Sequence, residues 1–252
     1  MCYIVSMLKD KNSLYAPILV LLLVVASFYV GRLSAQVSAL KGGTGTAGNE
    51  AKQAADPTTT ESPISVANLK VMAKNLGVDS GKFDKCLDDG TYAEKVSAEQ
   101  KEGQDLGVTG TPSFFINGIS IVGSLPQADF EKVIDAELKN GTGDKVKLES
   151  TGEVAKRVAK VPYGAGYIKG SKDAKIKIIE YTDFECPYCN RAFPTIEALL
   201  TKYGNNISLE YRSFPLPFHS SAQKAAEAAI CAGDQGKFWE MHDKMFEVMA
   251  AQ

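Results

Sequence analysis

Cys186-Pro187-Tyr188-Cys189 stands between a strand-like run at residues 175–181 and a helix predicted over residues 191–203. The spacing places both sulfurs at the start of the helix, one turn apart on one face. At that position the unpaired backbone N–H groups and the helix dipole favour a thiolate. Such a cysteine can have its pKa lowered from about 8.5 into roughly the 3.5–7.5 range. The stretch therefore predicts a dithiol–disulfide redox pair.

Zinc binding and an inert structural disulfide are the two alternatives for this spacing. A structural zinc site needs four ligands. Outside the motif the chain has three cysteines and two histidines, and none of them forms a second close pair: Cys2, Cys86, Cys231, His219 and His242. We therefore expect redox chemistry at Cys186 and Cys189, with no metal and no other cofactor.

The bulk composition fits one modest globular domain with accessory segments. A length of 252 residues allows one or two domains, and the net charge of −2 is nearly balanced. This balance gives no indication of nucleic-acid binding, so we expect no nucleic-acid partner.

The N-terminal segment, residues 1–35, predicts export. Residues 14–31 are uncharged and mostly aliphatic, and their length is near the lower end of the membrane-spanning range. Lysines precede this run and Arg32 follows it, so the positive charges do not fix the orientation. We expect a retained transmembrane signal anchor, with a cleaved signal peptide as the alternative. Either route takes the rest of the chain to the bacterial periplasm or cell surface, where disulfides persist.

A Gly/Thr/Ala-rich spacer at residues 36–62 predicts a flexible tether before the folded part at 63–252. A second Gly- and Lys-rich spacer covers residues 140–170, in which residues 153–160 have a weak helical pattern. Strands or helices are predicted elsewhere from hydrophobic period, capping residues and turn signals. The helices are expected at residues 65–76, 82–87, 91–106 (with a capping box from Thr91 to Glu94), 126–138, 222–232 and 238–249. A hairpin is expected at residues 113–122 around Asn117-Gly118, and a strand at residues 207–212.

Three motifs together resemble the DsbA-like thiol–disulfide oxidoreductases of the thioredoxin superfamily. The motifs are Asp183-Phe-Glu-Cys-Pro-Tyr-Cys189, Phe214-Pro-Leu-Pro-Phe-His219 and Gly107-Val-Thr-Gly-Thr-Pro-Ser-Phe-Phe-Ile-Asn-Gly118. The resemblance covers residues 62–252 apart from the second spacer. It implies an α/β thioredoxin-like fold with a helical insertion.

The order of the halves is inverted relative to that family, in which the Cys-x-x-Cys half comes first. Here the latter part of the helical insertion and the Thr-Pro hairpin, residues 63–139, precede the Cys-x-x-Cys half at 171–252. Circular permutation, two truncated tandem domains and a swapped dimer all fit this order. We favour permutation, because the pieces add up to one domain and the roughly thirty residues of 140–170 can extend to about 100 Å.

The resemblance also implies roles for residues outside the cysteine pair. It makes Thr111-Pro112 the cis-proline dipeptide that lies against the cysteines, whereas an ordinary trans proline at a strand start is the alternative. The permuted order also brings the helices that carry Cys86 and Cys231 near each other. We expect these two cysteines to form a structural disulfide, with two buried thiols as the alternative.

Several residues near the motif are weaker candidates. Pro187 and Tyr188 are expected to shape the helix start. Asp183 and Glu185 flank the cysteines and are candidates for tuning the pKa, or else are solvated loop carboxylates. His219 is placed either near the active site or at a surface helix start. In the last helix, Phe238 and Trp239 are expected in the core and His242 on the surface.

These observations predict a membrane-anchored extracytoplasmic oxidoreductase that forms disulfides in exported proteins. A substrate thiolate attacks Cys186, and Cys189 is the more buried, resolving thiol. Reduced or misoxidised exported proteins are the expected substrates, and a membrane redox partner resets the pair. An isomerase or reductase with the same site is the alternative, as is a non-catalytic peptide-binding module of thioredoxin fold.

Overall fold

The computed structural model describes residues 61–158 and 161–251 of the chain. The expected membrane span at 14–31 lies outside the described residues, as does the expected tether at 36–62 apart from its last two residues. Within the described ranges, no helix combines the length and the apolar character needed to cross a membrane.

The described residues form a six-stranded sheet with the order β3-β2-β1-β5-β6-β4. Neighbours β5 and β6 run parallel, and the other neighbouring pairs are antiparallel. These two parallel strands are buried along almost their whole length, so they form the centre of the core. The strands are β1 (Ser113–Ile116), β2 (Ile119–Val122), β3 (Lys156–Arg157), β4 (Tyr167–Gly170), β5 (Ile176–Thr182) and β6 (Ile207–Ser213).

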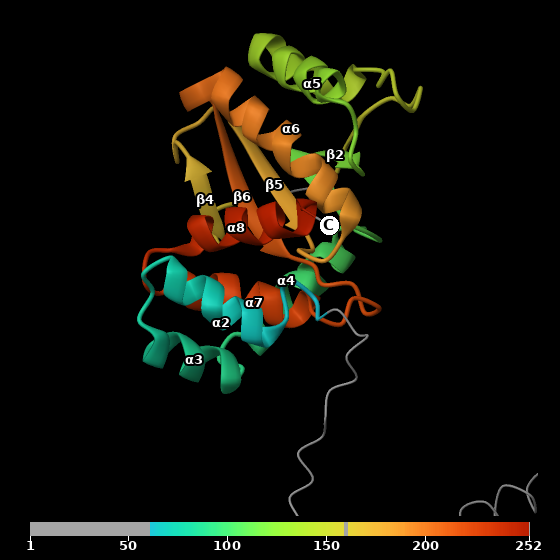
Figure 1. Ribbon diagram of the computed structural model, residues 1–252. Coiled ribbons are helices and arrows are strands. Elements are labelled where there is room, and N and C mark those ends of the chain that lie inside the picture. The colour runs from blue at the N-terminus through green and yellow to red at the C-terminus, as the bar shows by residue number, and fades with distance from the viewer. Residues whose placement is uncertain (1–60, 159–160, 252) are drawn as a thin grey trace, which may run out of the picture. The chain divides into compact units, whose positions relative to one another are not determined.

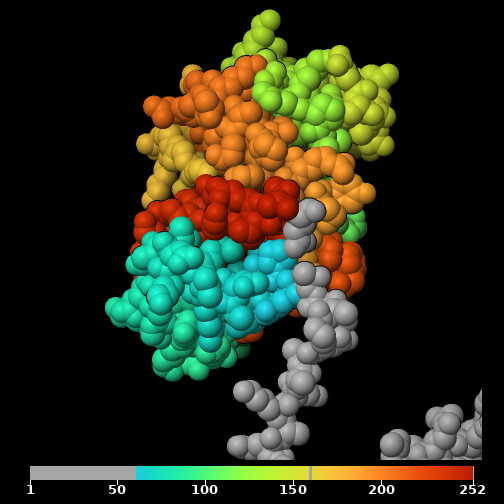
Figure 2. All heavy atoms as spheres, in the orientation of Figure 1, coloured from blue at the N-terminus to red at the C-terminus, as the bar shows by residue number. Residues whose placement is uncertain are grey.

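Pairing between β1 and β5 joins the two halves of the sequence. Ser113 lies opposite Tyr181, and Ile116 lies opposite Ile178. Both halves therefore contribute strands to one mixed parallel and antiparallel sheet within a single chain. Figure 2 shows the same mixing on the surface, where the early helical residues in cyan lie against the last helix in red.

Helices cover the sheet and extend it at one end. The apolar faces of α5 and α6 pack against β1, β2 and β5. Helices α2, α3 and α7 gather at the end of the domain away from α5 (Figure 1), and α8 contacts α6 and α7. The α-helices are α2 (Val66–Asn75), α3 (Ser80–Asp88), α4 (Ala93–Asp105), α5 (Gln127–Asn140), α6 (Pro187–Tyr203), α7 (Ala222–Gly233) and α8 (Phe238–Ala250), with 3-10 turns η2 (Gly143–Lys145) and η3 (Gly204–Asn206).

Most predicted elements are confirmed within a few residues. The hairpin forms around Asn117 and Gly118, whose φ angles of 48° and 84° suit a tight two-residue turn. Helix α6 begins at Pro187 rather than at residue 191, so it includes most of the cysteine motif. The predicted capping box at Thr91 is wrong, because α4 begins at Ala93 and its N-terminus has no side-chain cap.

The described residues of the second spacer, which was expected only as a joining linker, are packed against the domain. We call residues 141–166 the joining segment. The carboxylate of Asp129 accepts hydrogen bonds from the backbone N–H groups of Glu149 and Ser150, at 2.6 and 3.1 Å. Near its other end, the carboxylate of Glu210 accepts from the N–H groups of Gly164 and Gly166, both at 2.6 Å. Buried carboxylates on α5 and β6 thus fix the segment to the domain.

A short strand replaces the helix expected at residues 153–160. Lys156 and Arg157 form β3 and pair with Ser120 and Ile119 at the outer edge of β2. The unpaired backbone of an edge strand is a template for such pairing. Here this long-range pairing prevails over the weak local helical pattern.

A disulfide between Cys86 and Cys231 joins α3 to α7, with the two Cα atoms 6.0 Å apart. Cys231 is buried inside α7, and Cys86 is partly buried. The bond therefore links an early helix of the chain to a late one within the helical end of the domain.

His242 is buried, so the expected surface position is wrong. Its ring is only 2% exposed and contacts aromatic rings of α6, α8 and the sheet. The position lies four residues from both Phe238 and Phe246, which places all three on the buried stripe of α8. Phe238 is buried as expected, and Trp239 packs partly buried against the same core.

Candidate active site

The cysteine motif forms the first turn of α6. Cys186 is the N-cap residue, and Pro187 occupies the first helical position, where its missing N–H costs no hydrogen bond. The backbone N–H of Cys186 donates to the Asp183 carbonyl at 3.1 Å. Cys186 and Cys189 are both buried and unbonded, whereas Tyr188 is 55% exposed. The turn thus points two reduced sulfurs inward and presents Tyr188 to solvent.

The Thr111–Pro112 peptide bond is cis, and it lies against the cysteine pair. The Cys186 Sγ is 3.5 Å from the Thr111 carbonyl oxygen, to which the sulfur donates when Cys186 is protonated. These residues come from different halves of the sequence. One site therefore combines the cis-proline loop of the first half with the helix start of the second.

Opposite pKa shifts distinguish the two cysteines. A hydrogen bond from the Cys189 thiol lowers the pKa of Cys186 to about 5, assisted by the Thr111 hydroxyl and by backbone N–H groups of the helix start, against the effect of burial. Burial and the neighbouring Cys186 sulfur raise the pKa of Cys189 well above its ordinary value. Near neutral pH the site therefore holds a Cys186 thiolate beside a Cys189 thiol.

Glu180 is a buried acid six residues before Cys186, and the sequence reasoning did not single it out. It lies on β5, is 4% exposed, and burial raises its pKa to about 7. Thr182, on the same strand, lowers the pKa values of both Glu180 and Cys189. Its buried hydroxyl has no well-aligned hydrogen bond to any other described atom. The available signal was a carboxylate between Ile179 and Tyr181 in the strand before the motif.

Asp183 and Glu185 fix the loop at residues 214–221 beside the motif, so they are not solvated loop carboxylates. Buried Asp183 accepts hydrogen bonds from the N–H groups of Glu185 and Leu216, each at 2.8 Å. Glu185 accepts from the Ser221 N–H at 2.6 Å. The two side chains therefore connect the approach to α6 with the start of α7.

His219 completes this connection. Its Nδ1 atom is 2.8 Å from Asp183 Oδ2, the oxygen that also accepts from the Leu216 N–H, and its side chain is 15% exposed. The His219 ring contacts the ring of Phe218, which is 75% exposed. His219 is thus near the active-site turn through Asp183, and it supports an exposed aromatic side chain.

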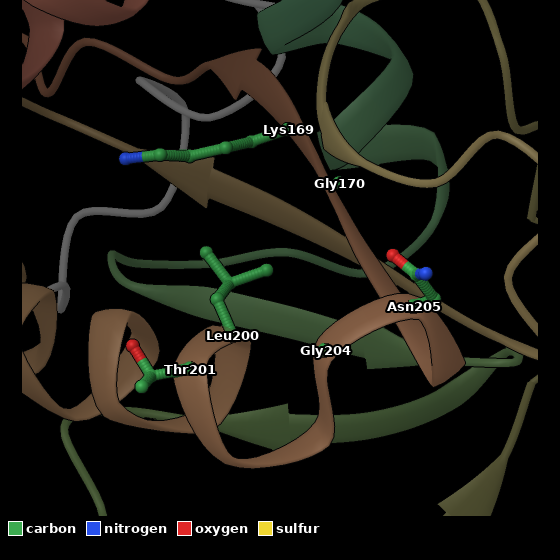
Figure 3. Close-up of a pocket in the computed structure, with 6 residues that line it drawn as sticks. All are labelled: Lys169, Gly170, Leu200, Thr201, Gly204 and Asn205. Carbon is green, nitrogen blue, oxygen red and sulfur yellow. The ribbon is translucent and has the colours of Figure 1, made fainter.

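A shallow pocket of about 330 Å³ lies elsewhere, between β4 and the end of α6 (Figure 3). Lys169 is the charged residue at this pocket, and its ammonium group extends away from Asn205 to pair with Glu197 and Asp243 at 2.8 and 2.9 Å. None of the sequence-predicted site residues lines it. Across residues 61–158 and 161–251, no cluster of His, Cys, Asp or Glu has an arrangement suited to a metal ion.

Comparisons with known families match the two halves separately. A family model described as a DSBA-like thioredoxin domain matches residues 57–135, and one described as thioredoxin matches residues 164–251. The interval between the matches contains most of the joining segment. The order of the matches agrees with the inverted order of the motifs.

Curated relatives match only a short part of their own length. Na(+)/H(+) antiporter NhaA 1 of Salinispora arenicola is 51% identical over 78 residues, which is 31% of this chain and 12% of that protein. NhaA 3 of Salinispora tropica is 46% identical over the same shares. NhaA 1 of Mycolicibacterium vanbaalenii is 40% identical over 82 residues, 32% of this chain and 13% of that protein.

Proposed function

We propose that this chain, which belongs to the DsbA-like proteins of the thioredoxin superfamily, is a thiol–disulfide oxidoreductase that forms disulfides in exported proteins. The observation that carries the proposal is the Cys186 sulfur beside Thr111 and cis-Pro112, with its pKa lowered to about 5. Low-pKa thiols at helix starts are the reactive groups of dithiol catalysts.

The reaction exchanges one disulfide for another in two steps. A substrate thiolate bonds to the Cys186 sulfur of the oxidised pair, the Cys186–Cys189 bond breaks, and Cys189 leaves with the electron pair and takes up a proton. A second substrate thiolate then attacks the substrate sulfur of the mixed disulfide, and Cys186 leaves as a thiolate. The substrate loses two electrons and two protons, of which one proton ends on Cys189 and the other goes to solvent.

Oxidation is the favoured direction because a stabilised leaving thiolate favours the reduced enzyme. The lowered pKa of Cys186 supports this direction over reduction. A reduction potential of about −120 mV would mark an oxidant, whereas one of about −270 mV would mark a reductase. Isomerase activity is tested separately, with a scrambled disulfide protein as substrate.

Glu180 supplies a proton to Cys189 in this scheme. Its raised pKa keeps a proton on the buried carboxyl below about pH 7. Thr182 lowers the pKa values of both Glu180 and Cys189, so the two groups share this neighbour. A leaving thiolate in a buried site needs a proton source, because an unpaired buried charge is costly. Glu180 is thus assigned as the proton donor to the resolving cysteine.

Circular permutation is the connectivity that we propose, and it is supported by the β1–β5 pairing within one chain. Sedimentation of the intact chain should give a monomer, and unfolding should be a single cooperative transition. An obligate dimer would instead favour exchange of halves between two chains.

We also propose that residues 14–31 anchor the catalytic domain on the extracytoplasmic side, where a membrane redox partner resets the pair. The apolar run in the sequence supports this arrangement. The antiporter names of the curated relatives describe proteins of which the match covers 12–13%, so ion transport is not part of the proposal.

Trapping of the mixed disulfide tests the central claim. Cys189→Ala should accumulate a covalent complex with a reduced cysteine-containing peptide after activation of Cys186 by an aromatic disulfide. Cys186→Ala should give no such complex under the same treatment. A peptide that binds both variants equally without any covalent product would instead identify a non-catalytic binding module.

A further inference from the structure

A buried tyrosine, Tyr181, lies beside both ends of the loop that carries the cis-proline. This loop, residues 106–112, begins where α4 ends and leads into β1. At its far end, Ser113 lies opposite Tyr181 in the pairing of β1 with β5. At its near end, the Tyr181 hydroxyl donates to the carboxylate of Glu102, on the last turn of α4, at 2.6 Å. One residue of the second half therefore contacts both boundaries of a loop from the first half.

Arg212 adds an ion pair at the same end of α4. It lies beside Tyr181 in the parallel pairing of β5 with β6, and its side chain is 2% exposed. Its guanidinium is 3.7 Å from the Glu102 carboxylate and 2.6 Å from that of Glu210, which also holds the joining segment. Burying a charge is costly unless it is paired, so Arg212 favours a Glu102 carboxylate that stays beside Tyr181. We call Glu102, Tyr181 and Arg212 the loop clamp.

The end of α4 packs tightly on the sheet beside the loop clamp. A Cβ atom on Gly103 would lie only 2.9 Å from the rings of Tyr181 and Phe214. One turn earlier, the Glu99 carboxylate accepts from the Ser213 N–H at 2.8 Å. These contacts keep α4 attached to β6 when the Tyr181 hydroxyl is removed. The contribution of that hydroxyl can therefore be tested without detaching the helix.

The Tyr181 hydroxyl keeps its proton throughout the neutral pH range. Burial, together with the hydrogen bond to Glu102 and the charge of that carboxylate, raises the pKa of Tyr181. An ionised carboxylate only accepts hydrogen bonds, so the tyrosine is the donor. Hydrogen bonds to a charged acceptor are stronger than those between neutral groups. The bond is therefore suited to fixing the end of α4.

We propose that the loop clamp positions one side of the active site: Tyr181 and Glu102 hold residues 106–112 so that Thr111 stays against Cys186. This inference rests on the proposed function and adds positioning residues to it. The Thr111 carbonyl oxygen lies 3.5 Å from the Cys186 sulfur, and the Thr111 hydroxyl assists the thiolate. Without the clamp, Thr111 moves away from the sulfur and the thiolate is less stable.

The test measures alkylation of Cys186 by iodoacetamide as a function of pH in the intact, reduced chain. Tyr181→Phe removes only the hydroxyl and should raise the midpoint by about half a pH unit, which is about a three-fold change in the acid dissociation constant of the thiol. Tyr163→Phe is the matched control. The Tyr163 side chain packs in the same apolar cluster as Tyr181, but its hydroxyl bonds to Ser208 on β6 rather than to α4. The control should leave the midpoint unchanged.

Two substitutions at Glu102 separate the hydrogen bond from the charge. Glu102→Gln and Glu102→Ala both remove the negative charge, but the amide oxygen of glutamine still accepts from the Tyr181 hydroxyl. Glu102→Ala should therefore have a higher alkylation midpoint than Glu102→Gln. Equal midpoints in these two variants would overturn the proposal.

A purely structural role of Tyr181 predicts a different result. It would lower the urea midpoint of Tyr181→Phe and leave the alkylation midpoint unchanged, and this outcome would overturn the clamp. Because the clamp acts through Thr111, Tyr181→Phe should add nothing to the alkylation midpoint in the Thr111→Val background. Full additivity of the two substitutions would show that Tyr181 acts on the thiolate by another route, which would also overturn the proposal.

Hydrogen exchange measures the loop itself. The Gly123 N–H donates to the Pro112 carbonyl at 2.8 Å, so its exchange should speed up when the loop moves. Exchange of Gly123 and of residues 106–113 should be about ten-fold faster in Tyr181→Phe, and unchanged in Tyr163→Phe. Unchanged exchange in Tyr181→Phe would overturn the clamp even if the alkylation midpoint shifts.

The proposed function can fail independently of the clamp. A chain that oxidises neither dithiothreitol nor a dithiol peptide would contradict the oxidoreductase assignment. Alkylation and hydrogen exchange require no turnover, so both would still decide whether the clamp positions Thr111. A raised alkylation midpoint with faster exchange in Tyr181→Phe would support the clamp, and no change in either would overturn it.

Discussion

The two cysteine pairs of this domain differ in almost every physical respect. Cys186 and Cys189 are three positions apart at a helix start and are unbonded, with pKa values shifted in opposite directions. Cys86 and Cys231 are 145 positions apart in the chain and form a disulfide between two helices. Backbone N–H groups and a neighbouring thiol activate the first pair, whereas the second links packed helices. The comparison shows that the local environment, rather than the residue type, decides whether a cysteine pair is redox-active or forms a structural disulfide.

The largest expected effect separates the two pairs by activity. Cys186→Ser should lower the oxidation of a dithiol peptide by on the order of a thousand-fold or more, because the attacked sulfur is gone. The urea midpoint of the reduced protein should change little. Retention of full activity would show that the Cys186 assignment is wrong.

Removing the second pair should have the reverse outcome. Cys86→Ser with Cys231→Ser should destabilise the domain by about 2–4 kcal/mol, because the open chain gains freedom when unfolded. Urea unfolding measures this loss, and kcat at low temperature should be retained. A large loss of kcat in a folded variant would contradict the division of roles between the pairs.

Glu180, on the strand that leads to the redox pair, adds a pH dependence to this comparison. Its pKa is raised from 4.5 to about 7 on folding, so the folded state binds more protons than the unfolded state between these values. Stability should therefore fall as pH rises from about 4.5 through 7, by on the order of 3 kcal/mol relative to Glu180→Gln. Urea midpoints of both proteins across this pH range measure the difference.

A parallel dependence of the two midpoints on pH would remove Glu180 as a titrating group. The activity readout is independent of stability. Oxidation of the peptide by the unaltered chain should slow above about pH 7, where Glu180 loses its proton, and this inflection should be absent in Glu180→Gln.

The smallest expected effect concerns the contribution of the first half of the chain to the thiolate. Alkylation of Cys186 by iodoacetamide should be half-maximal near pH 5. Thr111→Val removes the hydroxyl and should raise this midpoint by roughly one pH unit or less. Ser120→Ala, on the second strand of the same hairpin, is the matched control and should leave it unchanged. An unchanged midpoint in Thr111→Val would assign the lowered pKa of Cys186 to the helix start alone.

The elements that the sequence could predict are those whose signals are local. The hairpin at Asn117-Gly118 and the helix starts at Ser65 and the cysteine motif depend on turn residues and hydrophobic period, which lie within a few positions. The redox pair was likewise visible, because its spacing and its strand–helix context are contiguous. Thr111-Pro112 needed the family resemblance, since nothing in its neighbourhood requires contact with a residue seventy-five positions away.

What the sequence did not reveal depends on partners that are distant in the chain. The joining segment is rich in Gly and Lys, and it is held by Asp129 and Glu210, whose role is visible only after folding. His242 lies on the buried stripe of α8. It was predicted on the surface because its side chain is polar, although the hydrophobic period of the helix places it inside. Glu180 was overlooked because the strand around it was interpreted only by its apolar residues.

The Cys86–Cys231 disulfide also makes the domain a topological ring. Every peptide bond between these cysteines belongs to a closed covalent circuit that contains the cis-proline hairpin, the joining segment and the redox motif. A single protease cut anywhere on this circuit leaves one covalently connected molecule. The inverted order of the halves, which makes the joining segment their peptide connection, therefore does not make that segment their only covalent link.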